Sequence, residues 1–234
     1  MSGFLNVIIE QMERSTAGSG DTAKRVLQMC KGVKPKNALF LGDDVFSPRL
    51  IAETGAEVLA TFGEKKRAET AKAAGLNARQ VGAYEITKKD GGWDFIWYNG
   101  ITEPDGVMRR LEQIHEGLKP GGTAVFRTLC WLIDPSPDTK SYVERRFGRP
   151  IPLDEVLREA KDEKFSVEDF YIAPKSDWKR NFYEPMSELV RRLEGLDEDD
   201  GEQASGIGEI NKEIYMFDLH SEEYSFVYYI LKGK

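Results

Sequence analysis

The chain has 234 residues, with 33 basic and 40 acidic side chains and a formal net charge of −7. This balance disfavours a nucleic-acid binder, because no surplus of Lys and Arg is available to release counterions from phosphates. No stretch approaches the ~20 apolar residues of a membrane span. The first fifteen residues lack the basic start of a signal peptide, so we expect a cytoplasmic protein without a membrane partner.

Cysteine and histidine are scarce, which bears on metal and nucleophilic chemistry. The chain has two of each, Cys30 and Cys130, and His115 and His220. They form no CxxC or Cys/His pattern, so we expect no zinc site, disulfide framework or Ser-His-Asp triad. We interpret Cys130 as a core residue, His115 as the end of a helix and His220 as a poor candidate for a catalytic base.

The first hundred residues alternate between helical and strand patterns. An apolar helical pattern covers 4–12, and Asp21 is a good N-cap for a helix closed by Gly32. The short apolar run ALFLG is typical of a buried parallel strand. The elements expected from there on are a strand at 38–42, a helix at 47–54, a strand at 57–62, a helix at 64–75, a short strand at 82–86, a strand at 93–100 and a helix at 104–117.

LKPGG at 118–122 then leads into a strand at 123–132, after which the character of the chain changes. The later expected elements are a turn-rich loop at 134–142, a helix at 153–163, a strand at 167–174, an amphipathic helix at 177–195 broken near Pro185, a solvated acidic loop at 197–206 and a final strand at 223–234.

Alternation of strands and helices requires crossover connections, which predicts an α/β, doubly wound, mostly parallel sheet. We expect one domain over 1–234, with N-terminal helices at 1–33 and a core sheet at 36–133. A helical cap and remaining core elements would fill 134–210, and closing strands 211–234.

The order of motifs resembles the class I S-adenosylmethionine-dependent methyltransferases, nearest to a bacterial small-molecule subgroup. LKPGG looks like that family's turn into its fifth strand, GAEVLATF at 55–62 its second strand, and YSFVYYILKGK its closing antiparallel edge strand. The subgroup's further elements are matched by Gly18-Ser19-Gly20-Asp21, Trp131-Leu132-Ile133-Asp134, Ser176-Asp177-Trp178 and Tyr183-Glu184-Pro185-Met186. The resemblance implies a seven-stranded Rossmann-like sheet and S-adenosylmethionine as cofactor.

The cofactor residues that the resemblance implies depart from the family pattern in three places. Only Gly42 remains of the glycine-rich turn after the first strand, and the following loop reads Asp43-Asp44-Val45-Phe46. The acid that would accept bonds from the ribose hydroxyls falls on Phe62, with Glu64 two residues later. Ala83 and Tyr84 stand where an acid would contact adenine, and Asn99 follows the fourth strand. The fold looks intact while the cofactor site looks eroded.

Asp43 and Asp44 allow two interpretations. They are either a relocated acceptor for hydroxyl groups or ligands of a hard metal ion, or they form a polar cap on the helix at 47–54. Further converging carboxylates are absent from the pattern, so we expect no metal.

Aromatic residues mark the substrate side. Trp131 after the fifth strand and Trp178, Tyr183 and Tyr215 from the cap are candidates for binding a planar or cationic methyl acceptor. The alternative is that these rings pack the cap against the sheet. No catalytic residue is assigned, because methyl transfer relies mainly on proximity and orientation.

Two functions from different classes remain open. The first is a methyltransferase with a divergent cofactor loop that acts on a small molecule. The second is a catalytically degenerate subunit that binds a partner, in a homo-oligomer or beside an active methyltransferase. The apolar N-terminal segment at 4–9 would suit such pairing, and it would equally suit folding over the protein's own pocket.

Overall fold

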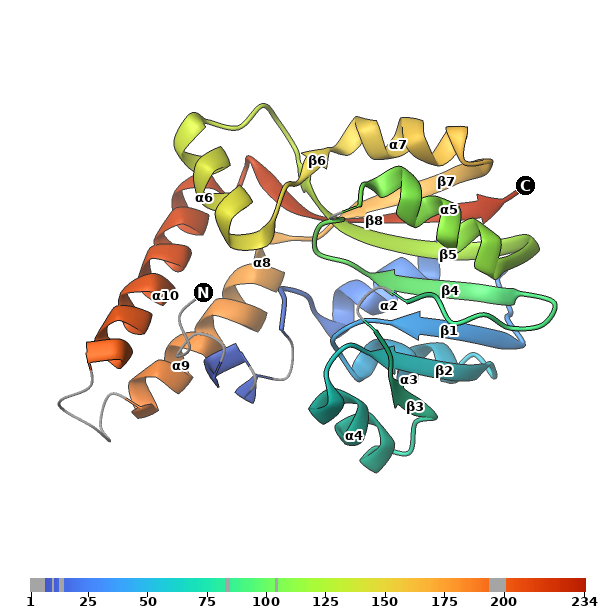
Figure 1. The fold of residues 1–234 in the computed structure, drawn as a ribbon, viewed down its shortest axis with the longest axis horizontal. Helices are drawn as coiled ribbons and strands as arrows, with labels where there is room; N and C mark the ends of the chain where they lie inside the picture. The colour runs from blue at the N-terminus through green and yellow to red at the C-terminus, as the bar shows by residue number, and fades with distance from the viewer. Residues whose placement is uncertain (1–6, 10, 13–14, 83–84, 104, 194–200) are drawn as a thin grey trace.

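The structure is a computed structural model that describes residues 7–9, 11–12, 15–82, 85–103, 105–193 and 201–234. One sheet forms its centre (Figure 1). Its strands are β1 (Asn37–Leu41), β2 (Glu57–Phe62), β3 (Ala78–Gln80), β4 (Trp93–Asn99), β5 (Leu118–Trp131), β6 (Ile151–Pro152), β7 (Phe165–Ile172) and β8 (Tyr224–Gly233). The strand order is β3-β2-β1-β4-β5-β8-β7, and β6 pairs with β5.

The mostly parallel doubly wound fold is confirmed. Strands β1 to β5 are parallel to one another, whereas β8 is antiparallel to both β5 and β7. The expected closing strand is therefore not an edge strand, since β8 lies between β5 and β7. The strand order reverses between β1 and β4, and ligands of open α/β sheets bind at such a switch point.

Two apolar layers enclose the sheet, as strand periodicity requires. Ala38 and Phe40 of β1 face one layer, while Leu39 and Leu41 face the other. Figure 1 shows α5 and α7 over the near face, α2 behind, and the cap helices α9 and α10 at the left. The helices are α2 (Gly20–Met29), α3 (Phe46–Ala52), α4 (Lys65–Ala73), α5 (Val107–Gly117), α6 (Pro137–Phe147), α7 (Leu153–Asp162), α8 (Lys175–Trp178), α9 (Glu184–Leu193) and α10 (Gly201–His220).

A π-helix, Lys179–Tyr183, joins α8 to α9 without a break in the chain's helical course. The expected interruption near Pro185 thus takes the form of a wide turn, followed by Pro185 in the first turn of α9. Because proline has no N–H to donate, Pro185 cannot complete the hydrogen-bond ladder of a continuous helix, and the wide turn precedes it. Within the described part of the chain, no helix combines the length and apolar character needed to cross a membrane.

Several expected boundaries were wrong. The N-cap of α2 is Ser19, whose hydroxyl accepts a hydrogen bond from the N–H of Thr22 at 3.0 Å, and Asp21 lies in the first turn. The expected strand at 82–86 is instead β3 at 78–80, which pairs with β2; residues 82, 85 and 86 are not in a strand, and 83–84 lie outside the described residues.

The expected loop at 134–142 contains the start of α6, where Ser136 caps the helix and Pro137 occupies its first turn. Proline at that position favours a helix start, because its fixed φ suits the first turn.

The acidic loop expected at 197–206 is also wrong where it is described. Residues 201–206 belong to α10, and 197–200 lie outside the described residues. Ile210, Glu213 and Phe217 are buried, and this packing stabilises α10 within the cap in spite of its glycines. Because α10 runs to His220, the closing segment begins at Tyr224 and not at 211.

Candidate functional site

A small cavity of about 160 Å³ lies at the carboxyl ends of β1, β2 and β4, beside the switch point. Three glycines, Gly42, Gly63 and Gly82, leave backbone bare along its wall. The remaining lining residues are Ser15, Thr16, Leu41, Asp43, Thr61, Val81, Tyr98, Asn99 and Ile101.

Gly42 sits where β1 and β4 approach each other closely. A Cβ at this position would lie 2.5 Å from Cζ of Phe40 and 3.0 Å from Cβ of Asn99. Its N–H donates to the carbonyl of Thr61 at 3.2 Å. The glycine is therefore required by the packing of the strands themselves.

Asp44 is 1% exposed and lies one residue before Val45, the N-cap of α3, so that its side chain reaches the first turn of the helix. Its carboxylate accepts hydrogen bonds from the N–H of Ser47 at 2.7 Å, from the Ser47 hydroxyl at 3.0 Å and from Nδ2 of Asn99 at 3.2 Å. The cap interpretation is confirmed for this residue. No group of three or more His, Cys, Asp or Glu side chains is arranged for a metal ion among the described residues.

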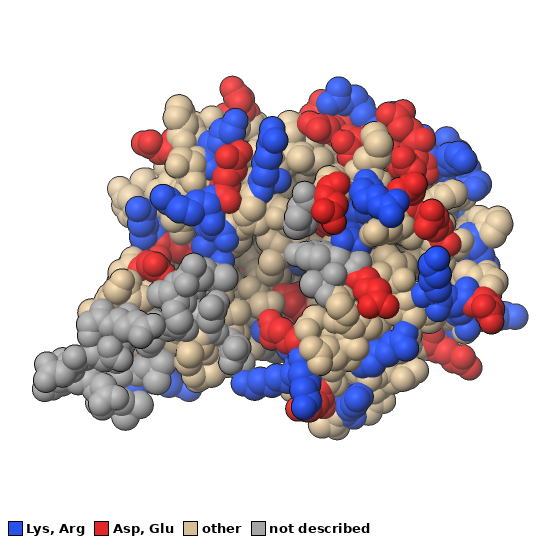
Figure 2. All heavy atoms as spheres, in the orientation of Figure 1, with Lys and Arg blue, Asp and Glu red and all other residues tan. Residues whose placement is uncertain are grey.

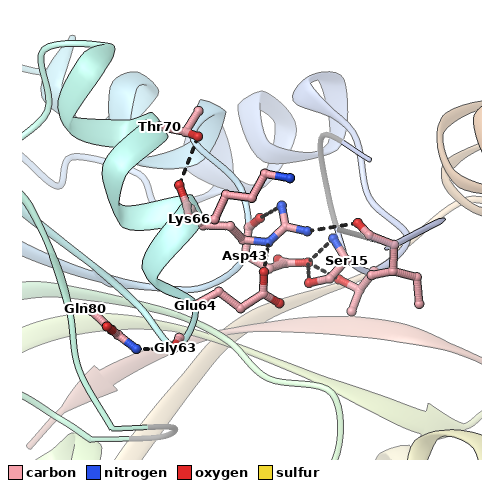
Figure 3. Close-up of polar contacts among 10 residues, drawn as sticks. Ser15, Asp43, Gly63, Glu64, Lys66, Thr70 and Gln80 are labelled. Carbon is pink, nitrogen blue, oxygen red and sulfur yellow. Dashed lines mark hydrogen bonds and ion pairs between the residues drawn. The ribbon is translucent and has the colours of Figure 1, made fainter. Parts of the chain in front are cut away.

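Asp43 has a different environment from its neighbour. Its Oδ2 accepts hydrogen bonds from the Ser15 hydroxyl at 3.0 Å, the Thr16 hydroxyl at 2.8 Å and the N–H of Ser15 at 3.2 Å (Figure 3). The guanidinium of Arg67 donates to its backbone carbonyl at 3.0 Å. Asp43 thus joins the β1–α3 loop to the N-terminal segment.

The other expected cofactor residues are placed as follows. Phe62 is 1% exposed and packs on Phe40, with ring centroids 5.9 Å apart. Glu64 forms an ion pair with Nε of Arg67 at 3.0 Å. Asn99 lies in the small cavity and accepts a hydrogen bond from Trp97 at 2.8 Å. Ala83 and Tyr84 lie outside the described residues.

A larger cavity of about 930 Å³ adjoins the small one through the β4–α5 loop. Ile101 lines the small cavity, and Thr102, the next residue, lines the large one. Trp131 also lines the large cavity, as expected of a substrate residue. Its charged lining residues are Glu103, Asp134, Lys140, Glu144, Arg149, Asp154 and Glu155. Figure 2 shows a hollow on this face between the cap and the sheet.

Glu103 is the most buried of these acids, with a side chain 2% exposed. It pairs with Arg110 at 2.9 Å and accepts a hydrogen bond from the Tyr98 hydroxyl at 2.9 Å. Burial raises the pKa of Glu103 above its usual value, and the hydrogen bond and charge of Arg110 oppose this only in part.

Trp178 and Tyr183 lie in an aromatic cluster formed by Phe147, Trp178, Tyr183, Phe217, Tyr224 and Phe226. Trp178 is 1% exposed, stacks on Phe217 and Phe226, and donates to the Ser225 hydroxyl at 3.2 Å. These two residues pack the cap against β8, which was the alternative to substrate binding. Tyr215 is 61% exposed on α10 and lines neither of the two cavities.

The histidines and cysteines occupy structural positions. His115 ends α5 and meets the ring of Phe165 edge-on, whereas Nδ1 of His220 lies 2.7 Å from Glu223. Cys130 is fully buried, with its sulfur 3.2 Å from the Tyr229 hydroxyl. Burial raises the pKa of the Cys130 thiol to about 12, which disfavours the reactive thiolate.

Sequence reasoning missed Ser15, Thr16 and Arg127. Arg127 is 1% exposed on β5 and donates to the Thr16 hydroxyl at 2.9 Å and the Ala17 carbonyl at 2.8 Å. Its guanidinium lies 3.6 Å from the centroid of Phe226. The one local indication is Arg127 itself, a charged residue inside the apolar run TAVFRTLCWL.

The residues around the small cavity fit a nucleoside ligand in kind. They offer bare backbone at three glycines, a carboxylate at Asp43 and an amide at Asn99. The space is limited, because ligand pockets typically measure ~300–1,000 Å³ and Ser15 and Thr16 occupy part of this site. The lining residues therefore suit a nucleoside in kind, while the cavity is smaller than the usual ligand pocket.

Solved structures with the same fold include several methyltransferases. A SAM-dependent methyltransferase from Geobacter sulfurreducens, in complex with S-adenosyl-L-homocysteine, has a TM-score of 0.80 and 13% identity over 100% of this chain and 99% of that one. One from Thiobacillus denitrificans, also with S-adenosyl-L-homocysteine, has a TM-score of 0.79 at 13% identity over 100% and 99%. YjhP from E. coli has a TM-score of 0.77 at 13% identity over 99% of both chains.

These similarities show that the chain has the class I methyltransferase fold, as its motifs predicted. No protein-family model matches the sequence. No curated protein matches it either.

Proposed function

We propose that the protein is an S-adenosylmethionine-dependent methyltransferase that acts on a small molecule. The observation that carries this proposal is the pair of adjoining cavities at the carboxyl edge of the sheet, which share the β4–α5 loop at Ile101 and Thr102. A methyl donor in one cavity and an acceptor in the other would meet at this loop, and such proximity supplies much of the rate of methyl transfer.

In this proposal the small cavity holds the nucleoside part of the cofactor. Backbone at Gly42, Gly63 and Gly82 lies against the ligand, while Asp43 and Asn99 supply polar contacts. The cofactor, when bound, supplies an electrophilic methyl group. The protein's own contribution is to hold both reactants and to exclude water from the loop between them.

The large cavity favours a cationic acceptor such as an amine. Five acids and two bases, Lys140 and Arg149, belong to its lining. Glu103 forms an ion pair with Arg110, and the other four acids are Asp134, Glu144, Asp154 and Glu155. Trp131 adds an aromatic surface that suits a cationic group.

Calorimetric titration with S-adenosylmethionine and S-adenosyl-L-homocysteine tests the proposal. Saturable binding is expected, and at ~100 times the dissociation constant it should stabilise the fold by about 2.7 kcal/mol. That corresponds to a rise of roughly 5–11 °C in melting temperature for a chain of this size. Transfer of labelled methyl groups to a panel of amines, with carboxylic acids as the matched panel, tests the acceptor class.

A second candidate is a degenerate subunit that binds a partner and no cofactor. The observation in its favour is that Ser15 and Thr16 already occupy the carboxylate of Asp43. It predicts that neither the natural chain nor a variant with these hydroxyls removed binds S-adenosyl-L-homocysteine at millimolar concentration. Binding by either protein would contradict this candidate.

A further inference from the structure

One carboxylate oxygen in the small cavity carries an unusual set of donors. Oδ2 of Asp43 receives two hydroxyl groups from adjacent residues, Ser15 at 3.0 Å and Thr16 at 2.8 Å, together with the N–H of Ser15. Figure 3 shows Ser15 directed at Asp43 from the N-terminal segment. A vicinal diol would offer a carboxylate the same kind of donors, namely two neighbouring hydroxyl groups.

Both polar contacts and apolar packing hold this stretch of chain at the cavity wall. Ile8, Met12 and Ala17 are buried in the apolar core, whereas Ser15 and Thr16 are joined to the wall by hydrogen bonds to Asp43. Arg127 of β5 donates to the Thr16 hydroxyl and to the Ala17 carbonyl. Arg67 of α4 donates to the Asp43 carbonyl at 3.0 Å and to the Ile9 carbonyl at 3.4 Å. Hydrogen bonds exchange readily for bonds to another donor, because their net contribution is small compared with their gross strength.

The position of Asp43 matters as much as its partners. Among the described residues that line the small cavity, it is the one carboxylate. The end of β2, where the resemblance places an acid, holds the buried ring of Phe62. Glu64 beyond it is paired with Arg67 and does not line the cavity.

We propose that Asp43 accepts the ribose diol of the nucleoside cofactor, and that the hydroxyls of Ser15 and Thr16 occupy this carboxylate until the cofactor displaces them. Ser15 and Thr16 thus compete with the ribose diol for the carboxylate of Asp43. This inference rests on the proposed function and adds to it a carboxylate on the β1–α3 loop and a segment that must move. The apparent affinity for the cofactor then equals the intrinsic affinity multiplied by the fraction of molecules in which Ser15 and Thr16 have left Asp43.

Calorimetry with S-adenosyl-L-homocysteine on three variants separates the roles. Asp43→Asn should weaken binding about ten- to hundredfold, since a hydrogen bond to a charged group is worth ~1.5–3 kcal/mol. The double variant Ser15→Ala/Thr16→Val should tighten binding about three- to tenfold, because it removes the competitor. Glu64→Gln, the matched control at the β2 position, should change the affinity less than about twofold. Equal binding by Asp43→Asn and the natural chain, or weaker binding by the double variant, would overturn the inference.

A ligand variant covers the case in which Asp43→Asn does not fold. The 2′-deoxy analogue of S-adenosyl-L-homocysteine should bind the natural chain about tenfold more weakly than the parent ligand. In a folded Asp43→Asn protein the two ligands should bind alike. Equal affinity of both ligands for the natural chain contradicts a role for the diol.

Hydrogen exchange gives a readout that does not depend on substitution. The N–H of Ser15 is bound to Asp43 in the structure, so saturating S-adenosyl-L-homocysteine should make residues 15–17 exchange faster. Slower exchange would mean that the segment stays in place over the ligand, which contradicts the displacement. If neither the natural chain nor the double variant binds the ligand at all, the proposed function fails. If the natural chain binds it and Asp43→Asn binds it equally, the inference alone fails.

Discussion

Two clusters fasten distant parts of the chain to the sheet, and they do so by different physics. The hydroxyl cluster of Ser15, Thr16, Asp43 and Arg127 holds the N-terminal segment through hydrogen bonds. The aromatic cluster around Trp178 holds the cap through stacked and edge-on rings. A hydrogen bond can be replaced by one to water or ligand, whereas a buried ring has no such substitute. Buried Ile8, Met12 and Ala17 also hold the N-terminal segment, so we expect the exchange to be confined to the hydrogen bonds of Ser15 and Thr16 while the cap stays docked.

The largest effect is expected in the aromatic cluster. Trp178→Ala should lower the free energy of unfolding by about 3–5 kcal/mol, because it leaves a cavity among five neighbouring rings. Urea denaturation followed by circular dichroism measures this change. Tyr215→Ala, at an exposed site on α10, is the control and should stay within about 0.5 kcal/mol. A cost near that of the control would mean that the cap is not held by this cluster.

A substitution at Gly42, in the wall of the small cavity, should lower the free energy of unfolding less than Trp178→Ala does. Gly42→Ala should cost about 1–3 kcal/mol, since its Cβ would meet Phe40 and Asn99. Gly63→Ala is a matched control in the same cavity wall, because nothing lies within 4 Å of a Cβ there. Urea denaturation of both variants tests this expectation, and equal stabilities would show that β1 and β4 can move apart at no cost.

Asp44 and Asp43 offer a comparison within a single loop. Asp44→Ala removes the cap of α3 and should cost about 0.5–2 kcal/mol of global stability. Asp43→Ala should act mainly on the N-terminal segment, with faster hydrogen exchange at residues 15–17 and protection of β1 retained. Loss of protection in β1 in the Asp43 variant, to the same degree as at 15–17, would contradict a releasable segment.

The smallest expected effect is a pH-dependent change in stability at Asp94, which lies at the amino end of β4. Burial alone would raise the pKa of Asp94, but the hydrogen bond from Lys119, the N–H groups of Asn37 and Lys36 and the charge of Lys119 together lower it. The folded state therefore favours the carboxylate, and this stabilisation is complete above the ordinary aspartate pKa of about 3.9. It is lost as the pH falls through the lower, folded value.

The difference in stability between the natural chain and Asp94→Asn should therefore shrink when unfolding is measured below about pH 4 instead of at pH 7. A difference that stays constant between these conditions would show that the Asp94 contacts do not favour its charged form.

Much of the fold could be predicted because local patterns and tertiary packing agree. The apolar runs at 38–42, 57–62 and 93–100 became strands because residues on both of their faces are buried. The failures lie where packing overrides propensity, as in α10, whose glycines predict a loop but whose Ile210 and Phe217 are buried. Strand β3 was misplaced because two of its three residues are exposed and show no apolar pattern.

The site was less accessible from sequence than the fold. The cap role of Asp44 could be inferred because its partner Ser47 is three residues away. The partners of Asp43 lie 27 and 28 residues away, and Arg127 reaches Thr16 across 111 residues. No local pattern encodes such contacts, since they depend on how the N-terminal segment crosses the end of the sheet.

The wide turn at Lys179–Tyr183 sets the rotation of the helix that follows it. Each residue of an α-helix advances the side chains by about 100°, so the one extra residue of a π turn rotates α9 by that angle. In this rotation Met186 and Val190 face inward and are buried. If the turn closed to an ordinary α turn with all its residues present, Pro185 and Leu189 would take the positions of Met186 and Val190. A deletion of one residue within the turn would remove the extra residue and leave Met186 and Val190 facing inward. The width of a single turn thus determines which side of a ten-residue helix meets the core.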